Sequence, residues 1–90
     1  LHVDWLLMGV HGMDVEAGFT TPNLAEAETN RALVATARRV AVVADNSKWG
    51  VVGLSTIAAL DEVDVLVSDD GLEPDARRTL DECCGRLVLA

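Results

Sequence analysis

The feature that most constrains the fold is a run of five apolar residues, Val40 to Ala44, with no polar residue among them. Such a run of small and β-branched side chains is typical of a strand that is buried on both faces of a parallel sheet. A second continuous run, from Trp5 to Val10, predicts another buried strand. Because this strand begins almost at residue 1 and needs neighbours on both sides, we expect that a preceding segment carries further strands of the sheet.

The rest of the chain alternates between helical and extended patterns. Frequent alanines and apolar residues at helical spacing predict a helix from Leu24 to Arg39. Residues 54–60 fit a strand, a helical turn, or one followed by the other. Further on, we predict a strand over 63–68, a helix from Pro74 to Cys83 or Cys84, and a last strand over 86–90. This alternation implies right-handed crossovers, so the sequence predicts an α/β, Rossmann-like fold with a mostly parallel sheet flanked by helices.

The first helix has two possible starts and a basic end. Thr21 can cap it with Pro22 at the first helical position, or Asn23 can cap it with Glu26 three residues later. Either start leaves free N–H groups and hydroxyls that face outward and can hold an anion. The arginines at 38–39 are expected in the last turn, where positive charge opposes the negative end of the helix dipole.

The charge of the chain excludes some classes of partner. Fifteen acidic residues against seven Lys and Arg give the 90 residues a formal charge of −8. Nucleic acids are bound through clustered basic side chains, so this segment is not expected to touch DNA itself. The apolar runs are too short to cross a bilayer and no leader opens the sequence, so we expect a soluble, cytoplasmic protein without a membrane partner.

The cysteines and histidines do not form a metal-binding pattern. Cys83 and Cys84 are adjacent, and adjacent cysteines rarely bridge each other without a strained peptide. We therefore expect reduced thiols, one packed and one partly exposed. His2 and His11 are too few and too isolated to indicate zinc, and we expect neither a metal nor a cofactor.

Two loops carry the polar residues that indicate a binding site. Asp45, Ser47 and Lys48 directly follow the central strand, at the sheet edge where ligands of open α/β folds gather. Lys48 offers a positive charge, and Asp45 an acceptor for sugar hydroxyls, which together indicate a small polyhydroxylated anion. Two glycines three apart in the loop 9–14 permit a close approach of backbone N–H groups to a ligand. The alternative is that these residues only shape turns and that Lys48 is solvated.

These residues lie within a series of short sequence motifs that together are similar to those of a known family. The chain resembles the carboxyl-terminal half of the effector-sensing domain of DeoR-type bacterial transcription regulators. The resemblance covers essentially the whole chain, through G-V-H-G-M-D at 9–14, G-F-T-T-P-N at 18–23, E-A-E-T-N-R at 26–31, A-D-N-S-K-W-G at 44–50 and V-D-V-L-V-S-D at 63–69.

The resemblance implies a sensor with a fold similar to ribose-5-phosphate isomerase, which binds a phosphorylated sugar and relays its occupancy to an amino-terminal winged-helix DNA-binding domain. That domain, and the first half of the sensor with its phosphate loop, are not found in the sequence, so the fold is expected to be truncated at its N-terminal side. The ligand-binding residues that the resemblance implies are Gly9, His11, Gly12, Asp14, Thr20, Thr21, Asp45 and Lys48. Where His11 and Trp49 stand, the family often has Asp or Asn and Phe, respectively.

An isomerase is the rival interpretation. Isomerases of this fold place a glutamate base about fifteen residues before the motif aspartate, and moving a proton requires that carboxylate. Counting back from Asp45 reaches Asn30, whose amide cannot accept a proton. Glu28 is two residues earlier, which turns its side chain by about 200° around a helix. Met8 and His11 stand where further carboxylates are expected. We therefore predict binding without catalysis and no catalytic residue.

A third interpretation is an oligomerisation module. Exposed aliphatic strand edges favour contact between copies, and this can coexist with sensing. We expect a homo-oligomer.

Overall fold

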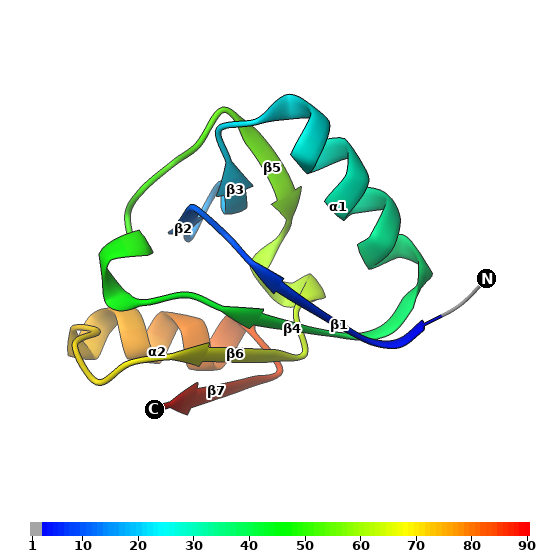
Figure 1. Cartoon of the computed structure of the whole chain (residues 1–90). Helices are drawn as coiled ribbons and strands as arrows, with labels where there is room; N and C mark the ends of the chain where they lie inside the picture. Colours follow the sequence, from blue (N-terminus) through cyan, green and yellow to red (C-terminus); the bar gives the residue numbers. More distant parts are fainter. Residues whose placement is uncertain (1–2) are drawn as a thin grey trace.

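The computed structural model describes residues 3–90, so His2 lies outside the described residues (Figure 1). Two sheets, two α-helices and two short 3₁₀ helices make up the fold. The elements in chain order are β1 (Val3–Gly9), β2 (Gly12–Asp14), β3 (Gly18–Thr21), α1 (Leu24–Thr36), β4 (Ala37–Val43), η1 (Asn46–Lys48), β5 (Ser55–Ala58), η2 (Leu60–Glu62), β6 (Val65–Ser68), α2 (Pro74–Cys83) and β7 (Arg86–Leu89).

The main sheet is parallel throughout, with strand order β1-β4-β6-β7. Figure 1 shows α1 and a smaller sheet, with strand order β2-β3-β5, above β1 and β4. The pairs of this smaller sheet are antiparallel. The predicted α/β architecture with a mostly parallel sheet flanked by helices is confirmed.

One face of the main sheet is covered and the other is bare. Met8, Val42 and Leu66 are buried, whereas their neighbours Leu7 and Val43 are 69% and 49% exposed. The strand order explains this difference. Each connection moves one place in the same direction across the sheet, and right-handed crossovers in one direction all pass over the same face. The prediction that the runs at 5–10 and 40–44 are buried on both faces is therefore wrong for this chain.

The first helix starts at the second of the two predicted caps and ends earlier than predicted. Asn23 is the N-cap, and its side chain accepts a hydrogen bond from the Glu26 N–H at 3.0 Å. The helix ends at Thr36, because the residues from Ala37 onward pair with β1.

The prediction that the arginines at 38–39 lie in the last helical turn is accordingly wrong. Both belong to β4, where they face residues of β1. Arg38 Nε lies 3.7 Å from Asp4 Oδ1, and the Arg39 guanidinium lies 5.7 Å from the centre of the Trp5 ring. Pairing with β1 therefore gives these side chains partners that a helix end would not.

The smaller sheet was not predicted. Its strands have three or four residues each, too few to show a period, and β3 lies in the stretch expected to lead into the helix. Met13 of β2 and Phe19 of β3 are fully buried, so this sheet forms much of the core. For residues 54–60 the sequence allowed a strand, a helical turn, or one followed by the other. The structure has the last of these: β5 is followed by the start of η2.

The two cysteines are free, as expected. Cys84 is buried and Cys83 is partly buried. Burial raises the pKa of the Cys84 thiol to about 11, so it stays protonated at neutral pH. Within residues 3–90 there is no cluster of His, Cys, Asp and Glu side chains suited to a metal ion. No helix in this part of the chain has the length and apolar character needed to cross a membrane.

The two glycines of the loop 9–14 differ in their surroundings. A Cβ on Gly12 would clash with the Val51 carbonyl oxygen and lie 2.6 Å from Thr20 Oγ1, whereas one on Gly9 would meet only the Val43 carbonyl oxygen, at 3.9 Å. Gly12 is therefore required for the close packing of the smaller sheet against the loop after η1. Gly9 leaves open space at the carboxyl end of β1.

We predict that Gly12→Ala lowers the free energy of unfolding by about 2 kcal/mol, the usual cost of overpacking a rigid contact. Gly9→Ala, the matched control, should change it by less than about 0.5 kcal/mol, as substitutions outside packed contacts do. Thermal or urea unfolding of the two variants measures the difference. Equal stability of the two variants would contradict the packing role of Gly12.

Candidate functional site

The two predicted loops leave the main sheet at the same edge and touch each other. Because β1 and β4 are parallel, with Gly9 opposite Val43, the chain turns away from both strands at their carboxyl ends. The Gly50 N–H donates to the Met13 carbonyl oxygen at 2.8 Å, and Met13 and Trp49 pair as an isolated parallel bridge. The structure thus brings the loops 9–14 and 45–50 together.

Asp45 begins the turn that carries Lys48. Its Oδ1 accepts a hydrogen bond from the Ser47 N–H at 2.9 Å and another from the Ser47 hydroxyl. These hydrogen bonds from Ser47, helped by the nearby charge of Lys48, lower the pKa of Asp45, so its carboxylate is ionised at neutral pH. Lys48 is half-buried and, among residues 3–90, makes no ion pair. A cation on a fixed turn, near the Asp45 carboxylate but in no ion pair, can interact with an external anion.

Asp69, at the end of β6, holds the same turn from the neighbouring strand. Its Oδ1 accepts from Asn46 Nδ2 at 2.8 Å and from the Gly71 N–H at 3.0 Å, and its Oδ2 accepts from the Asn46 N–H at 3.2 Å. These hydrogen bonds, chiefly those from Asn46, lower the pKa of Asp69. Sequence reasoning gave Asp69 no role. The available signal was a second strand that ends in an acid, directly beside the first in a parallel sheet.

A hollow of about 190 Å³ lies between the carboxyl ends of β4 and β6. This volume is below the range of about 300–1,000 Å³ that is usual for ligand sites, so the hollow has room for only part of a ligand. Its lining includes both Asp45 and Asp69. The lining residues are Val43, Ala44, Asp45, Val67, Ser68, Asp69 and Ala90.

A larger hollow, of about 330 Å³, lies elsewhere, and none of the predicted site residues lines it. Its lining residues are Val15, Ala59, Leu60, Asp61, Glu82 and Cys83. Both hollows are lined by two acidic residues and no basic one, so the charge of the lining does not distinguish them. The candidate site is assigned to the sheet edge because the two predicted loops, and Lys48 with them, meet there.

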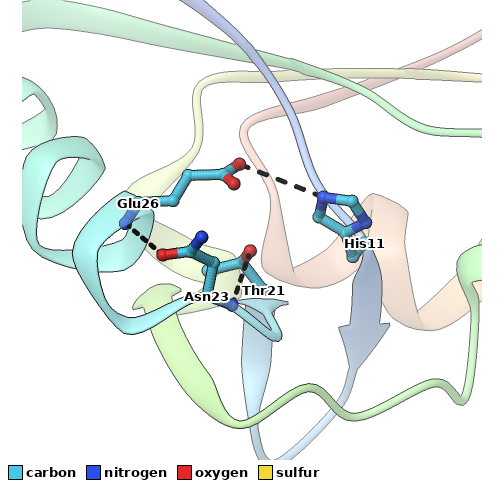
Figure 2. A network of polar contacts seen from close by, with 4 residues as sticks. All are labelled: His11, Thr21, Asn23 and Glu26. Atoms are coloured by element: carbon cyan, nitrogen blue, oxygen red, sulfur yellow. Dashed lines mark hydrogen bonds and ion pairs between the residues drawn. The ribbon is translucent and has the colours of Figure 1, made fainter.

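His11 faces the start of α1 across the loop (Figure 2). It is exposed, with Nε2 3.9 Å from Glu26 Oε1. The same close-up shows Asn23, whose Oδ1 accepts from the Glu26 N–H, and Thr21, whose Oγ1 accepts from the Asn23 N–H at 3.4 Å. The helix start is thus capped by its own side chains, and His11 is its contact with the loop 9–14.

The structure separates four of the predicted ligand-binding residues from the others. Thr20 and Thr21 are 1% and 0% exposed, and Thr20 Oγ1 accepts from the Gly53 N–H at 2.8 Å. Asp14 Oδ2 accepts from the backbone N–H groups of residues 16 and 17, both at 3.0 Å, and Gly12 is buried. These four residues shape the loops, whereas Gly9, His11, Asp45 and Lys48 lie where a ligand can reach them.

Two of the residues in the isomerase positions, Asn30 and Met8, cannot act as a base. Asn30 lies half-buried on α1, and Met8 is buried within β1. Neither an amide nor a thioether accepts a proton from a sugar carbon at neutral pH. The arrangement therefore suits the binding of an anion and lacks the carboxylates of proton transfer at these two positions.

The fold and the polar edge define an α/β ligand-binding module. A sequence model described as the DeoR C terminal sensor domain matches residues 1–70, and the chain belongs to this family. The family resemblance stated from the motifs is thereby confirmed.

Similar proteins that are named as transcription regulators support the same assignment. The chain is 38% identical over 78 residues to the HTH-type transcriptional regulator GlpR of Haloferax volcanii, which covers 87% of the chain and 31% of the relative. It is 33% identical over 88 residues to a putative aga operon transcriptional repressor of Escherichia coli O157:H7, covering 98% of the chain and 33% of the relative. It is also 37% identical over 71 residues to the transcriptional repressor AccR of Agrobacterium fabrum, covering 78% and 28%.

The chain therefore spans about a third of the length of these relatives. All three are named as regulators or repressors of transcription, which agrees with the prediction of a sensor domain that is not an enzyme.

We predict that Thr20→Val destabilises the protein by about 1–3 kcal/mol, because it leaves the partly buried Gly53 N–H without its acceptor. Thr20→Ser keeps the hydroxyl and is the matched control; it should lose only the smaller contribution of a methyl group. Urea unfolding of both variants provides the comparison. A Thr20→Val protein as stable as the parent would show that this hydroxyl does not support the loop.

Proposed function

We propose that this chain is the effector-binding part of a DeoR-type transcription regulator and that its effector is a phosphorylated sugar. The observation that carries the proposal is the position of Lys48. In a chain of charge −8, this half-buried lysine stands at the carboxyl edge of a parallel sheet, near the Asp45 carboxylate but in no ion pair with the described residues. Its turn is fixed from two sides, by Met13 and by Asp69.

The chemistry of the neighbouring groups suits such an effector. The ammonium of Lys48 would bind the phosphate as a compact point charge. The ionised carboxylate of Asp45 would accept hydrogen bonds from sugar hydroxyls, since Ser47 occupies only Oδ1. His11 and the open backbone at Gly9 lie on the neighbouring loop and would contact the remaining part of the sugar. Gly12, Asp14, Thr20 and Thr21 would act by holding the loops in place.

Binding without turnover is part of the proposal. A fold similar to ribose-5-phosphate isomerase would place the ligand at the same edge, and the rival function is isomerisation. The amide of Asn30 and the thioether of Met8 supply no base for that reaction. The names of the relatives favour regulation.

The domain organisation of the full-length protein follows from the same reasoning. We propose that an amino-terminal winged-helix domain binds DNA and that the first half of the sensor covers the bare face of the main sheet. Two features support this: the net charge of this segment disfavours contact with DNA, and Trp5 and Leu7 are 51% and 69% exposed on β1.

We further propose that the regulator is a cytoplasmic homo-oligomer. Leu24 and Leu54 are large apolar side chains that are exposed in this part of the chain, and such residues favour contacts between copies. Repressors among the named relatives favour repression as the mode of control.

We predict that saturation with a sugar phosphate stabilises the full-length protein, by about 2.7 kcal/mol at 100 times the dissociation constant. A thermal-shift titration with a panel of sugar phosphates and the corresponding neutral sugars measures this. Lys48→Ala should remove most of the shift, and Lys48→Arg should keep part of it. The matched control is Arg78→Ala, which removes an equal charge from an exposed ion pair with Asp75. An unchanged shift in Lys48→Ala would reject Lys48 as the anion partner.

The same preparation distinguishes sensor from isomerase. Incubation with ribose 5-phosphate should yield no ketose product, because the amide of Asn30 stands in the position of the isomerase glutamate. Formation of the ketose at a rate proportional to protein concentration would overturn the sensor assignment.

A further inference from the structure

We infer that Asp69 is the positioning residue of the effector turn 45–48, and that it couples this turn to the start of α2. The inference rests on the proposed function only for the identity of the ligand. The coupling itself rests on contacts between three segments: the turn after β4, the turn after β6 and the first turn of α2.

The first contact joins the turn after β4 to the turn after β6. Both carboxylate oxygens of Asp69 accept from Asn46, at 3.2 Å from its N–H and at 2.8 Å from its Nδ2. Asn46 lies between Asp45 and Lys48, the two residues proposed to hold the effector. Two hydrogen bonds to one residue fix both the position and the orientation of the turn, since a single bond would leave it free to rotate.

The second contact continues from Asp69 into its own turn. Asp69 Oδ1 also accepts from the Gly71 N–H at 3.0 Å. A Cβ at Gly71 would clash with Nδ2 of Asn46, so the two turns pack without space between them. A displacement of Asn46 must therefore displace the turn 69–72 as well.

The third contact ties this turn to α2. Arg77 Nε donates to the Leu72 carbonyl oxygen at 2.8 Å, and Arg77 Nη2 donates to the Asp70 carbonyl oxygen. Leu72 is buried, so the turn is anchored both by a charge-assisted bond and by packing. The contacts thus run without interruption from the effector turn to the side chain of Arg77.

These contacts provide a route by which effector binding at the turn 45–48 can affect the start of α2. An effector that pulls on Lys48 or Asp45 would shift Asn46, and Asp69 would pass that shift to the 69–72 turn and to α2. Contiguous networks of hydrogen bonds and packed side chains can carry coupling between two sites, and these three contacts form such a network.

The test compares Asp69→Asn with Asp70→Asn in the full-length protein. The two variants lose the same charge at adjacent positions, but the side chain of Asp70 accepts no hydrogen bond from the described residues. An asparagine at 69 presents an N–H₂ group to the donors of Asn46, so at least one of the two bonds is lost.

The first measurement needs no ligand. In Asp69→Asn, hydrogen exchange of the Asn46 backbone amide and of the Arg77 Nε–H should accelerate about tenfold, and in Asp70→Asn by less than about twofold. Exchange at Val42, in the core of β4, should be unchanged in both and excludes general destabilisation. Acceleration at Asn46 without any at Arg77, or equal effects of the two variants, would overturn the coupling.

The second measurement adds ribose 5-phosphate and glucose 6-phosphate as probes. The dissociation constant of the better probe should rise about tenfold in Asp69→Asn and stay within about twofold in Asp70→Asn. The exchanged pair Asn46→Asp with Asp69→Asn should recover at least half of the loss in affinity, a rescue that a merely structural residue would not show. An unchanged affinity in Asp69→Asn, or no rescue by the exchanged pair, would overturn the positioning role. If neither probe binds the parent protein, the proposed effector class is rejected, and the exchange measurement still decides the coupling.

Discussion

The pairing of β1 with β4 is the interaction on which the rest of the structure depends. The two strands are joined in parallel from Val3 opposite Ala37 to Gly9 opposite Val43. This register places the ends of both strands at one edge, and the two loops that follow meet there through Met13 and Gly50. A shift of β1 by one residue would turn Met8 out of the core and expose it on the bare face. The site and the core are therefore set by the same pairing.

The parts of the fold that a local pattern determines were predictable from the sequence. Continuous apolar runs identified β1 and the second half of β4, and Pro74 marked the start of the second helix. The features that depend on pairing between strands were not predictable from the sequence. The residues at 37–39 have side chains that suit a helix, but the partner strand β1 draws them into β4. The exposed face of β1 was missed for a similar reason, since composition does not show the direction in which successive crossovers run.

The candidate site was predictable to a similar degree. The motif residues Asp45 and Lys48, and the loop that begins at Gly9, do lie at one edge of the sheet. Their surroundings were not deducible from the motifs. Thr20 and Gly12 are buried supports, and the Asn46 to Asp69 contact joins positions 23 residues apart. A resemblance identifies which residues recur, whereas burial and hydrogen bonding distinguish those that can reach a ligand from those that hold the loops.

The two loops that follow β1 and β4 are proposed to bind the effector together. Backbone NMR of the isotope-labelled protein, titrated with a sugar phosphate, tests this proposal most directly. The amide signals of Gly9, His11 and Lys48 should shift together and follow a single binding curve. Shifts confined to the larger hollow around Leu60 and Cys83, or separate curves for the two loops, would contradict it.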